Sequence, residues 1–212
     1  MHRRELMLKQ GLKTKIKAGV KEIIETVVFV VVMVIIIRFF VGEIRWIPSG
    51  SMRPTLIEGD RIFVEKTSLF FSKPKRGDIL VFYPPMVTLQ KNPSAVFGRL
   101  TGFFCKDVAY IKRLIGLPGD KIVIKPNDEG RYGVFVNGKK LNESYIMDDY
   151  DYIPCMKGMY CGPFTVPKDK YFMLGDNRGN SQDSRFWGFL PENRIVGRAI
   201  FLFWPFTRAH GL

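Results

Sequence analysis

A serine and a lysine of this chain have sequence surroundings that suit nucleophilic catalysis. Ser51 lies in the stretch Pro-Ser-Gly-Ser-Met-Arg-Pro-Thr-Leu, residues 48 to 56, and Lys112 lies in the apolar stretch Tyr-Ile-Lys-Arg, residues 110 to 113. A serine hydroxyl becomes a nucleophile when a base removes its proton, and a neutral amine is one such base. Both stretches follow a long apolar segment, so the pair predicts an enzyme whose substrates emerge from a membrane.

The base hypothesis requires a lysine that is neutral near pH 7. Free lysine has a pKa of about 10.4, and burial among apolar groups lowers it. On a strand, Lys112 would share a face with Tyr110 and Leu114. The alternatives are a solvated lysine on an edge strand and, for Ser51, a loop serine that bonds nearby backbone. In the catalytic interpretation, the Ser49 hydroxyl and the Ser51 amide are the donors for a developing oxyanion.

Other catalytic chemistries lack the residues they need. The only histidines are His2 and His210, one near each end of the sequence, so a Ser-His-Asp triad or a histidine metal centre has no imidazole. We therefore expect no metal and no cofactor. The polar run from Gly175 to Arg185 is typical of a turn after a strand, and calcium binding is the alternative for it. Its carboxylates alternate with arginines and lack the EF-hand spacing.

The apolar segment from residue 23 to residue 41 reads IIETVVFVVVMVIIIRFFV. As a helix it would rise about 28 Å, close to the hydrocarbon thickness of a bilayer. Glu25 and Arg38 lie near its ends, where side chains reach the interface. A buried core helix and a cleaved signal peptide are the alternatives, but no Ala-x-Ala site follows the segment. We predict an uncleaved transmembrane anchor over residues 22–41.

Positive charge is concentrated before the anchor. The chain of 212 residues has a net charge of +13, and residues 1–21 contain seven basic groups and one acid. Positive flanks stay in the cytoplasm, so we predict a cytoplasmic tail over residues 1–21 and an extracytoplasmic domain over residues 42–212. No nucleic-acid-binding motif accompanies the charge, and no nucleic-acid partner is expected.

Three cysteines follow the anchor. Cys155 and Cys161 would close a short loop if a disulfide joins them, which is permitted outside the cytoplasm. Cys105 would then be free. Three unpaired thiols are the alternative, because sequence alone does not determine pairing.

The residues after the anchor predict a mainly β domain. The turn Gly-Leu-Pro-Gly-Asp (116–120) and the Asn137-Gly138 hairpin separate β-branched runs. Two regions interrupt the pattern: a loop over residues 84–106, which either packs on the core or touches the bilayer, and an insertion over residues 126–167. We expect strands at residues 44–47, 61–65, 79–83, 108–115, 121–125, 133–136, 171–174 and 195–203.

Four blocks occur in order behind the anchor: residues 48–56, the Arg-Gly-Asp-Ile-Leu-Val-Phe run at 76–82, the Tyr-Ile-Lys-Arg-Leu-Ile-Gly-Leu-Pro-Gly-Asp run at 110–120, and residues 175–188. With their flanking strands they cover about a third of the chain. This set closely resembles the bacterial type I signal peptidases, or leader peptidases. The resemblance implies a LexA-like β catalytic core with an inserted second β subdomain.

The resemblance also implies roles at matching positions. Ser51 would be the nucleophile, Lys112 the general base, Ser49 an oxyanion-hole donor and Ser181 the residue that orients Lys112. Cleavage of signal peptides after Ala-x-Ala sites would follow, at the bacterial inner membrane. Gly175 would pack against the lysine, and Asp183 and Arg185 would support the site. The shallow substrate pockets would be lined by Ile47, Pro48, Met52, Leu56, Tyr110 and Ile111.

Two features depart from the family pattern. Gly179 stands where many members have an acid, which concerns the rigidity of the turn, and the chain has one anchor where some members have two. Rival interpretations are a self-cleaving LexA-like repressor, a peptidase specialised for pilus or conjugation proteins, and an inactive membrane-tethered β binding module. The repressor would need a DNA-binding domain, and the inactive module would not need Ser51, Lys112 and Ser181 together.

Overall fold

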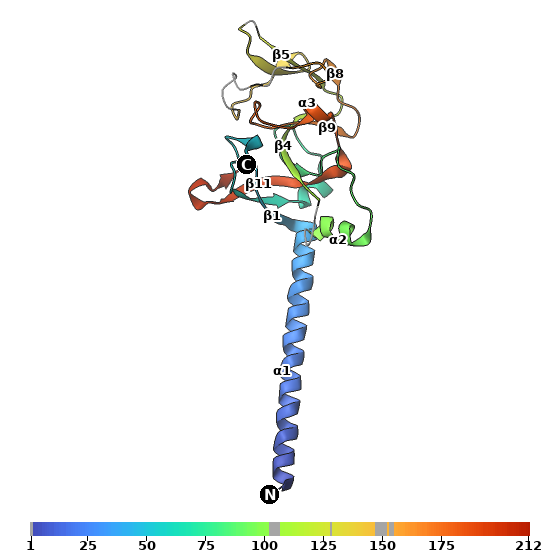
Figure 1. Ribbon diagram of the computed structural model, residues 1–212, viewed down its shortest axis with the longest axis vertical. Coiled ribbons are helices and arrows are strands. Elements are labelled where there is room, and N and C mark those ends of the chain that lie inside the picture. Colours follow the sequence, from blue (N-terminus) through green and yellow to red (C-terminus); the bar gives the residue numbers. More distant parts are fainter. Residues whose placement is uncertain (1, 102–106, 128, 147–151, 153–154) are drawn as a thin grey trace.

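The computed structural model describes residues 2–101, 107–127, 129–146, 152 and 155–212. Its most prominent element is the helix α1 (His2–Ile36), which continues as a π-helical turn η1 (Ile37–Val41). Residues Lys15–Val41 are long and apolar enough to cross a membrane, with a mean hydropathy of 2.7 and no residue of the most apolar window buried. The helix projects away from the β domain as a single stem (Figure 1) and passes residue 21 without a break.

An eight-stranded antiparallel sheet receives the chain directly from η1. Every pairing in it is antiparallel, and β4 lies between β3 and β9. Strand β12 (His210–Gly211) pairs with β11 outside the main path. The main order is β1 (Gly42–Trp46), β2 (Arg61–Glu65), β11 (Ile195–Trp204), β3 (Ile79–Phe82), β4 (Tyr110–Gly116), β9 (Lys170–Leu174) and β10 (Leu190–Pro191).

A second, four-stranded sheet lies at the end of the domain farthest from α1 (Figure 1). The turn between its middle strands has positive φ at both Asn137 (52°) and Gly138 (83°), as the predicted two-residue hairpin requires. The sheet begins before the predicted insertion, because β5 starts at Lys121 and runs on from β4. Its order is β7 (Lys139–Lys140), β6 (Tyr132–Val136), β5 (Lys121–Pro126) and β8 (Phe164–Thr165).

The mainly β prediction is confirmed, and each of the eight expected strands overlaps an observed one. The helix α2 (Pro93–Thr101) was not predicted, because nine residues are too few to establish a helical period. It lies inside the region predicted as a loop, beside the end of α1 (Figure 1). Cys105 lies outside the described residues. Short helical turns occur at η2 (Gly50–Met52), η3 (Thr67–Phe70), α3 (Ser184–Trp187), η5 (Glu192–Arg194) and η6 (Phe206–Arg208).

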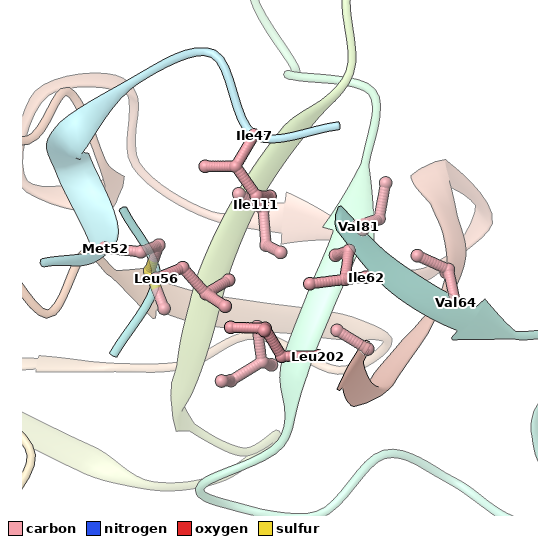
Figure 2. Packing of buried hydrophobic residues seen from close by; sticks show 10 residues of the cluster. Ile47, Met52, Leu56, Ile62, Val64, Val81, Ile111 and Leu202 are labelled. Carbon is pink, nitrogen blue, oxygen red and sulfur yellow. The ribbon is translucent and has the colours of Figure 1, made fainter. Parts of the chain in front are cut away.

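Three buried clusters form the core. The first fills the region between the Ser51 loop, β2, β3, β4 and β11, where Ile47 lies against Ile111, and Met52 beside Leu56 (Figure 2). The second includes Ile115, Ile122 and Phe172 and joins the two sheets. The third includes Leu80, Phe82 and Leu114. Strand β4 contributes to all three clusters, so it is held on both faces.

Candidate active site

Ser51 is the middle residue of the 3₁₀ turn η2, which follows β1. The loop is closed at its base by backbone hydrogen bonds of 2.9 Å from Ile47 to Asp60 and from Gly59 to Ile47. Met52 is 0% exposed and anchors the turn in the first core cluster. The Ser51 side chain is half-buried and belongs to the wall of a cavity, so the turn presents a hydroxyl without exposing it fully.

Lys112 is in the centre of the large sheet, on β4. Its register partner on β3 is Leu80, and Tyr110 is opposite Phe82. Opposed residues of an antiparallel pair point to the same face, so Lys112 shares its face with the apolar side chains of the third cluster. The lysine is 4% exposed. The predicted environment, an amine on an apolar strand face, is what the structure has.

The two side chains meet. Lys112 Nζ lies 2.7 Å from Ser51 Oγ and donates a 2.9 Å hydrogen bond to the carbonyl oxygen of Ile111. Burial lowers the pKa of Lys112 to about 8, and the carboxylates of Asp183 and Asp176 oppose this shift. About a tenth of the amine is therefore neutral at pH 7, and it lies within hydrogen-bonding distance of a hydroxyl.

Gly175 leaves room for this arrangement. A Cβ atom at Gly175 would lie 2.2 Å from Ser181 Oγ and 2.5 Å from the carbonyl oxygen of Ser51. Any larger residue would displace one of these groups. The turn after β9 and the Ser51 turn are thus packed backbone to backbone. The nearest neighbours of Gly175 are Ser181 and Ser51, and not Lys112, against which it was expected to pack.

Ser181 is next to the pair but is not bonded to it. Its side chain is buried, and among the described residues its Oγ has no hydrogen-bond partner. The expected hydrogen bond between Ser181 and Lys112 is therefore absent from this structure. A buried hydroxyl without a partner is costly.

Asp183 and Arg185 form a completely buried ion pair beneath the site. Arg185 Nε and Nη2 each donate to Asp183 at 2.9 Å, and both side chains are 0% exposed. The Asp183 carboxylate also accepts from the amide of Gly175 at 3.1 Å and caps the first turn of α3. The pair therefore fixes the start of the turn that packs against Ser51.

A cavity of about 360 Å³ opens beside Ser51 and Lys112. Of the six expected pocket residues, Pro48, Tyr110 and Ile111 line it, and Ser49, which is exposed, lines it too. The other three are Ile47, Met52 and Leu56, which do not line the cavity; they are at most 2% exposed and pack in the first core cluster (Figure 2). The remaining wall is formed by Gly50, Ser51, Val108, Ala109, Lys112, Asn180 and Gln182.

Several supporting residues were not identified from the sequence. Asn177 donates from Nδ2 to the carbonyl of Gly50 at 3.0 Å, and from its amide to the carbonyl of Ser51 at 3.2 Å. Arg113 donates twice to Asp176, at 2.9 and 2.7 Å. All three residues lie inside the quoted blocks, but nothing in a polar turn indicates which carbonyls its side chains will reach.

Cys155 and Cys161 are joined by a disulfide, with their Cα atoms 6.1 Å apart. The cross-link lies in the second core cluster, where Cys161 is 8% exposed. Within the described part of the chain, no three histidine, cysteine or acidic side chains gather as a metal site would require.

The chain is similar to known proteins over most of its length. The family described as signal peptidase, peptidase S26, matches residues 20–204. The chain is 46% identical over 172 residues to signal peptidase I of Leptolyngbya laminosa, covering 81% of this chain and 73% of the relative. It is 43% identical over 174 residues to a probable signal peptidase I-2 of Synechocystis, covering 81% and 67%.

Among solved structures, the crystal structure of a signal peptidase I from Enterococcus faecalis V583 has 28% sequence identity and a TM-score of 0.40. The match covers 60% of this chain and 97% of that one. The family match spans most of the present chain, and the sequence relatives cover four fifths of it. The chain therefore belongs to the signal peptidase family, peptidase S26, and is a serine endopeptidase.

Proposed function

We propose that this enzyme cleaves signal peptides from exported preproteins with Ser51 as nucleophile and Lys112 as general base. The observation that carries the proposal is the 2.7 Å distance between Lys112 Nζ and Ser51 Oγ. The amine at this distance has a pKa of about 8. A neutral amine accepts the hydroxyl proton at this distance, and its burial keeps that state populated.

The chemistry divides into two transfers. Ser51 Oγ attacks the scissile carbonyl carbon while its proton passes to Lys112 Nζ. The resulting oxyanion collapses, the peptide bond breaks, and the new amino group of the mature protein takes the proton from Lys112. Water then attacks the acyl-enzyme, again losing a proton to Lys112, and Ser51 leaves with that proton. The signal peptide is released with a free carboxylate.

The Ser49 hydroxyl and the Ser51 amide are the proposed oxyanion donors. Ser51 lies in the first turn of η2, where amides have no partner within the turn. Ser49 lines the same cavity. Ser181, whose hydroxyl is buried without a partner, is the proposed group that orients the neutral lysine.

Specificity for Ala-x-Ala is proposed to come from the shallow apolar floor of the cavity. Pro48, Tyr110 and Ile111 line it, and the core residues below are packed without exposure. A floor supported in this way does not deepen for a larger side chain, so it excludes bulky residues sterically.

Anchoring in a membrane follows from α1. Most of its apolar side chains between Ile23 and Ile36 are exposed; Phe29, for example, is 64% exposed. In lipid that exposure is favourable. The basic residues before the span favour a cytoplasmic N-terminus and an extracytoplasmic peptidase domain. Val96, Phe97 and Leu100, each at least 40% exposed, belong to α2, which lies beside the end of α1 (Figure 1), and we propose that they touch the bilayer surface.

The test is cleavage of a preprotein whose signal ends in Ala-x-Ala, in liposomes, by the wild type, Ser51→Ala and Ser72→Ala. Ser72 is an exposed serine that bonds only backbone in η3, and it is the matched control. We expect one cut, after the second alanine, with the wild type and the control, and none with Ser51→Ala. A cut by Ser51→Ala at the wild-type rate would reject the nucleophile, and a different cleavage position would reject the specificity.

A further inference from the structure

The end of the proposed membrane anchor is joined to the peptidase domain by a buried ionic cluster that the catalytic site does not use. It consists of Arg38 of η1, Glu43 and Arg45 of β1, and Lys66, the residue after β2. Glu43 is 2% exposed and Lys66 is 8% exposed. Isolated charges are rarely buried to this degree, so the cluster must hold its place through its contacts.

Lys66 uses its ammonium group to bring three segments together. Its Nζ donates to the carbonyl of Arg38 at 2.9 Å, to Glu43 Oε2 at 3.1 Å and to the carbonyl of Leu100 at 3.2 Å. An ammonium has three N–H donors, and here each has an acceptor on a different element: η1, β1 and α2.

The carbonyl acceptors are helix ends. Arg38 belongs to the last turn of the anchor, and Leu100 to the last turn of α2. Carbonyls in a last turn have no partner within the helix, and cations are favoured there. The side chain of Arg38 in turn donates from Nε to the carbonyl of Thr101, so the two helix ends are also bonded to each other directly.

Backbone and hydroxyl contacts complete the junction. The amide of Lys66 donates to the carbonyl of Val41 at 2.9 Å, and Thr67 Oγ1 donates to the carbonyl of Phe40 at 3.0 Å. No linker separates the anchor from the sheet, since β1 begins at Gly42, where a Cβ atom would lie 2.5 Å from the carbonyl oxygen of Val64. A junction with this many bonds is a rigid joint and not a flexible tether.

We propose that this joint, centred on Lys66 and Glu43, fixes the height and tilt of the peptidase domain above the bilayer and thereby selects which bond of a membrane-held substrate reaches Ser51. The proposal rests on the proposed function, in which the signal peptide stays in the membrane while it is cut. Each residue of an extended substrate spans about 3.3 Å, so a domain held at one height reaches a narrow range of positions. Lys66 and Glu43 are positioning residues and touch no reacting atom.

The test compares Lys66→Met with the wild type on two substrates sharing one cleavage site: a preprotein in liposomes and a soluble peptide in detergent. The liposome series varies the number of residues between the apolar segment of the signal and the cleavage site. Lys73→Met is the control, because Lys73 is an exposed lysine whose ion pair with Glu192 lies on the surface.

For Lys66→Met we expect kcat/KM on the best membrane substrate to fall about tenfold, because small misplacements cost this much or more. Activity on the soluble peptide should stay within about twofold, and the dependence on spacing should flatten. Lys66→Arg keeps a cation with several donors and should restore part of the spacing preference. It also serves as the test variant if Lys66→Met does not fold. An unchanged spacing optimum, or an equal loss on both substrates, would overturn the proposal.

A geometric measurement separates this inference from the proposed function. A fluorophore at Lys139→Cys, on the exposed strand β7, with Cys105→Ser to remove the remaining thiol, reports energy transfer to an acceptor lipid at the bilayer surface. We expect a narrow distance distribution that broadens in Lys66→Met. The same distribution in both would overturn the joint even if cleavage fails altogether, whereas failure of the wild type to cut would overturn only the function.

Discussion

Lys112 and Lys66 are buried to a similar extent, 4% and 8% exposed, in contrasting surroundings. Lys66 lies against the Glu43 carboxylate and two helix-end carbonyls. Lys112 has one carbonyl, one hydroxyl and an apolar strand face, and its nearest carboxylates act only through space. Burial is thus common to both lysines, and the polar partners differ. Lys66 donates to a carboxylate and two carbonyls, whereas Lys112, buried in an apolar setting beside a hydroxyl, can accept a proton.

The largest expected difference between the two lysines is in catalysis. Lys112→Met removes the only amine within reach of Ser51 among the described residues, and we expect kcat on a soluble peptide to fall by about 10³-fold or more. Lys66→Met, the same substitution at the joint, should leave that activity within about twofold. Steady-state kinetics on one peptide measure both. Equal losses in the two variants would contradict the assignment of Lys112, and not Lys66, as the base.

The second difference is in stability: the two substitutions should change the free energy of unfolding in opposite directions. Lys112→Met removes an amine whose pKa is about 8 when folded and about 10.4 when unfolded, so we expect the free energy of unfolding at pH 7 to rise by about 1 to 3 kcal/mol. Lys66→Met leaves the buried carboxylate of Glu43 with fewer partners and should lower the free energy of unfolding by about 3 kcal/mol. Denaturant titration of the full chain in detergent measures both.

The pH dependence of the first effect follows from the direction of the shift. The pKa of Lys112 is lower in the folded state, so burying this lysine reduces the free energy of unfolding of the wild type. The reduction is complete below about pH 8, decreases as the pH rises, and is absent above about 10.4. The gain in Lys112→Met should follow the same course. A gain that persists unchanged at pH 10.5 would mean that better packing, and not the buried amine, is its cause.

Catalysis should depend on pH in the same range. With a pKa of about 8, roughly a tenth of Lys112 is neutral at pH 7, so kcat/KM should rise about tenfold between pH 7 and a plateau above pH 9. For Lys66→Met, the pH profile of kcat/KM on the soluble peptide should have the same midpoint, because Lys66 is not the general base. A midpoint that moves in Lys66→Met would couple the two sites and contradict the division proposed here.

The sequence predicted one of these lysines and not the other. Lys112 was identified because it lies in an ordered set of blocks and in an apolar strand with a serine block before it. Lys66 ends an ordinary β-branched run, and its partners Arg38, Glu43 and Leu100 come from three segments that only the folded chain brings together. Burial of a charge by distant segments leaves no periodicity in the sequence.

The same reasoning separates the parts of the fold. Strands as long as β4 and β11 were predicted because alternation and flanking turns are local signals. The strands β8, β10 and β12 have two residues each and exist only through their pairing. In the site, Gly175 was expected to pack on the lysine, and its actual neighbours Ser181 and Ser51 were not foreseen. The bonds from Asn177 to the Ser51 turn were not predicted either, because an asparagine in a polar turn has many possible acceptors.

The smallest expected effect concerns Asn177, which helps to hold the Ser51 turn beside Lys112. It tests whether the partner of Lys112 is held as firmly as the partners of Lys66. The acceptors of Lys66 are held by helices and a strand, whereas Ser51 lies in a single 3₁₀ turn that Asn177 bonds at two carbonyls. Asn177→Ala removes the side-chain bond to Gly50 and should lower kcat about three- to tenfold with little change in KM, since the loss is in alignment. Asn142→Ala, in the second subdomain, is the control. If Asn177→Ala changes KM and leaves kcat intact, the turn is held by the core through Met52, and the Ser51 side of the pair is as rigidly built as the joint around Lys66.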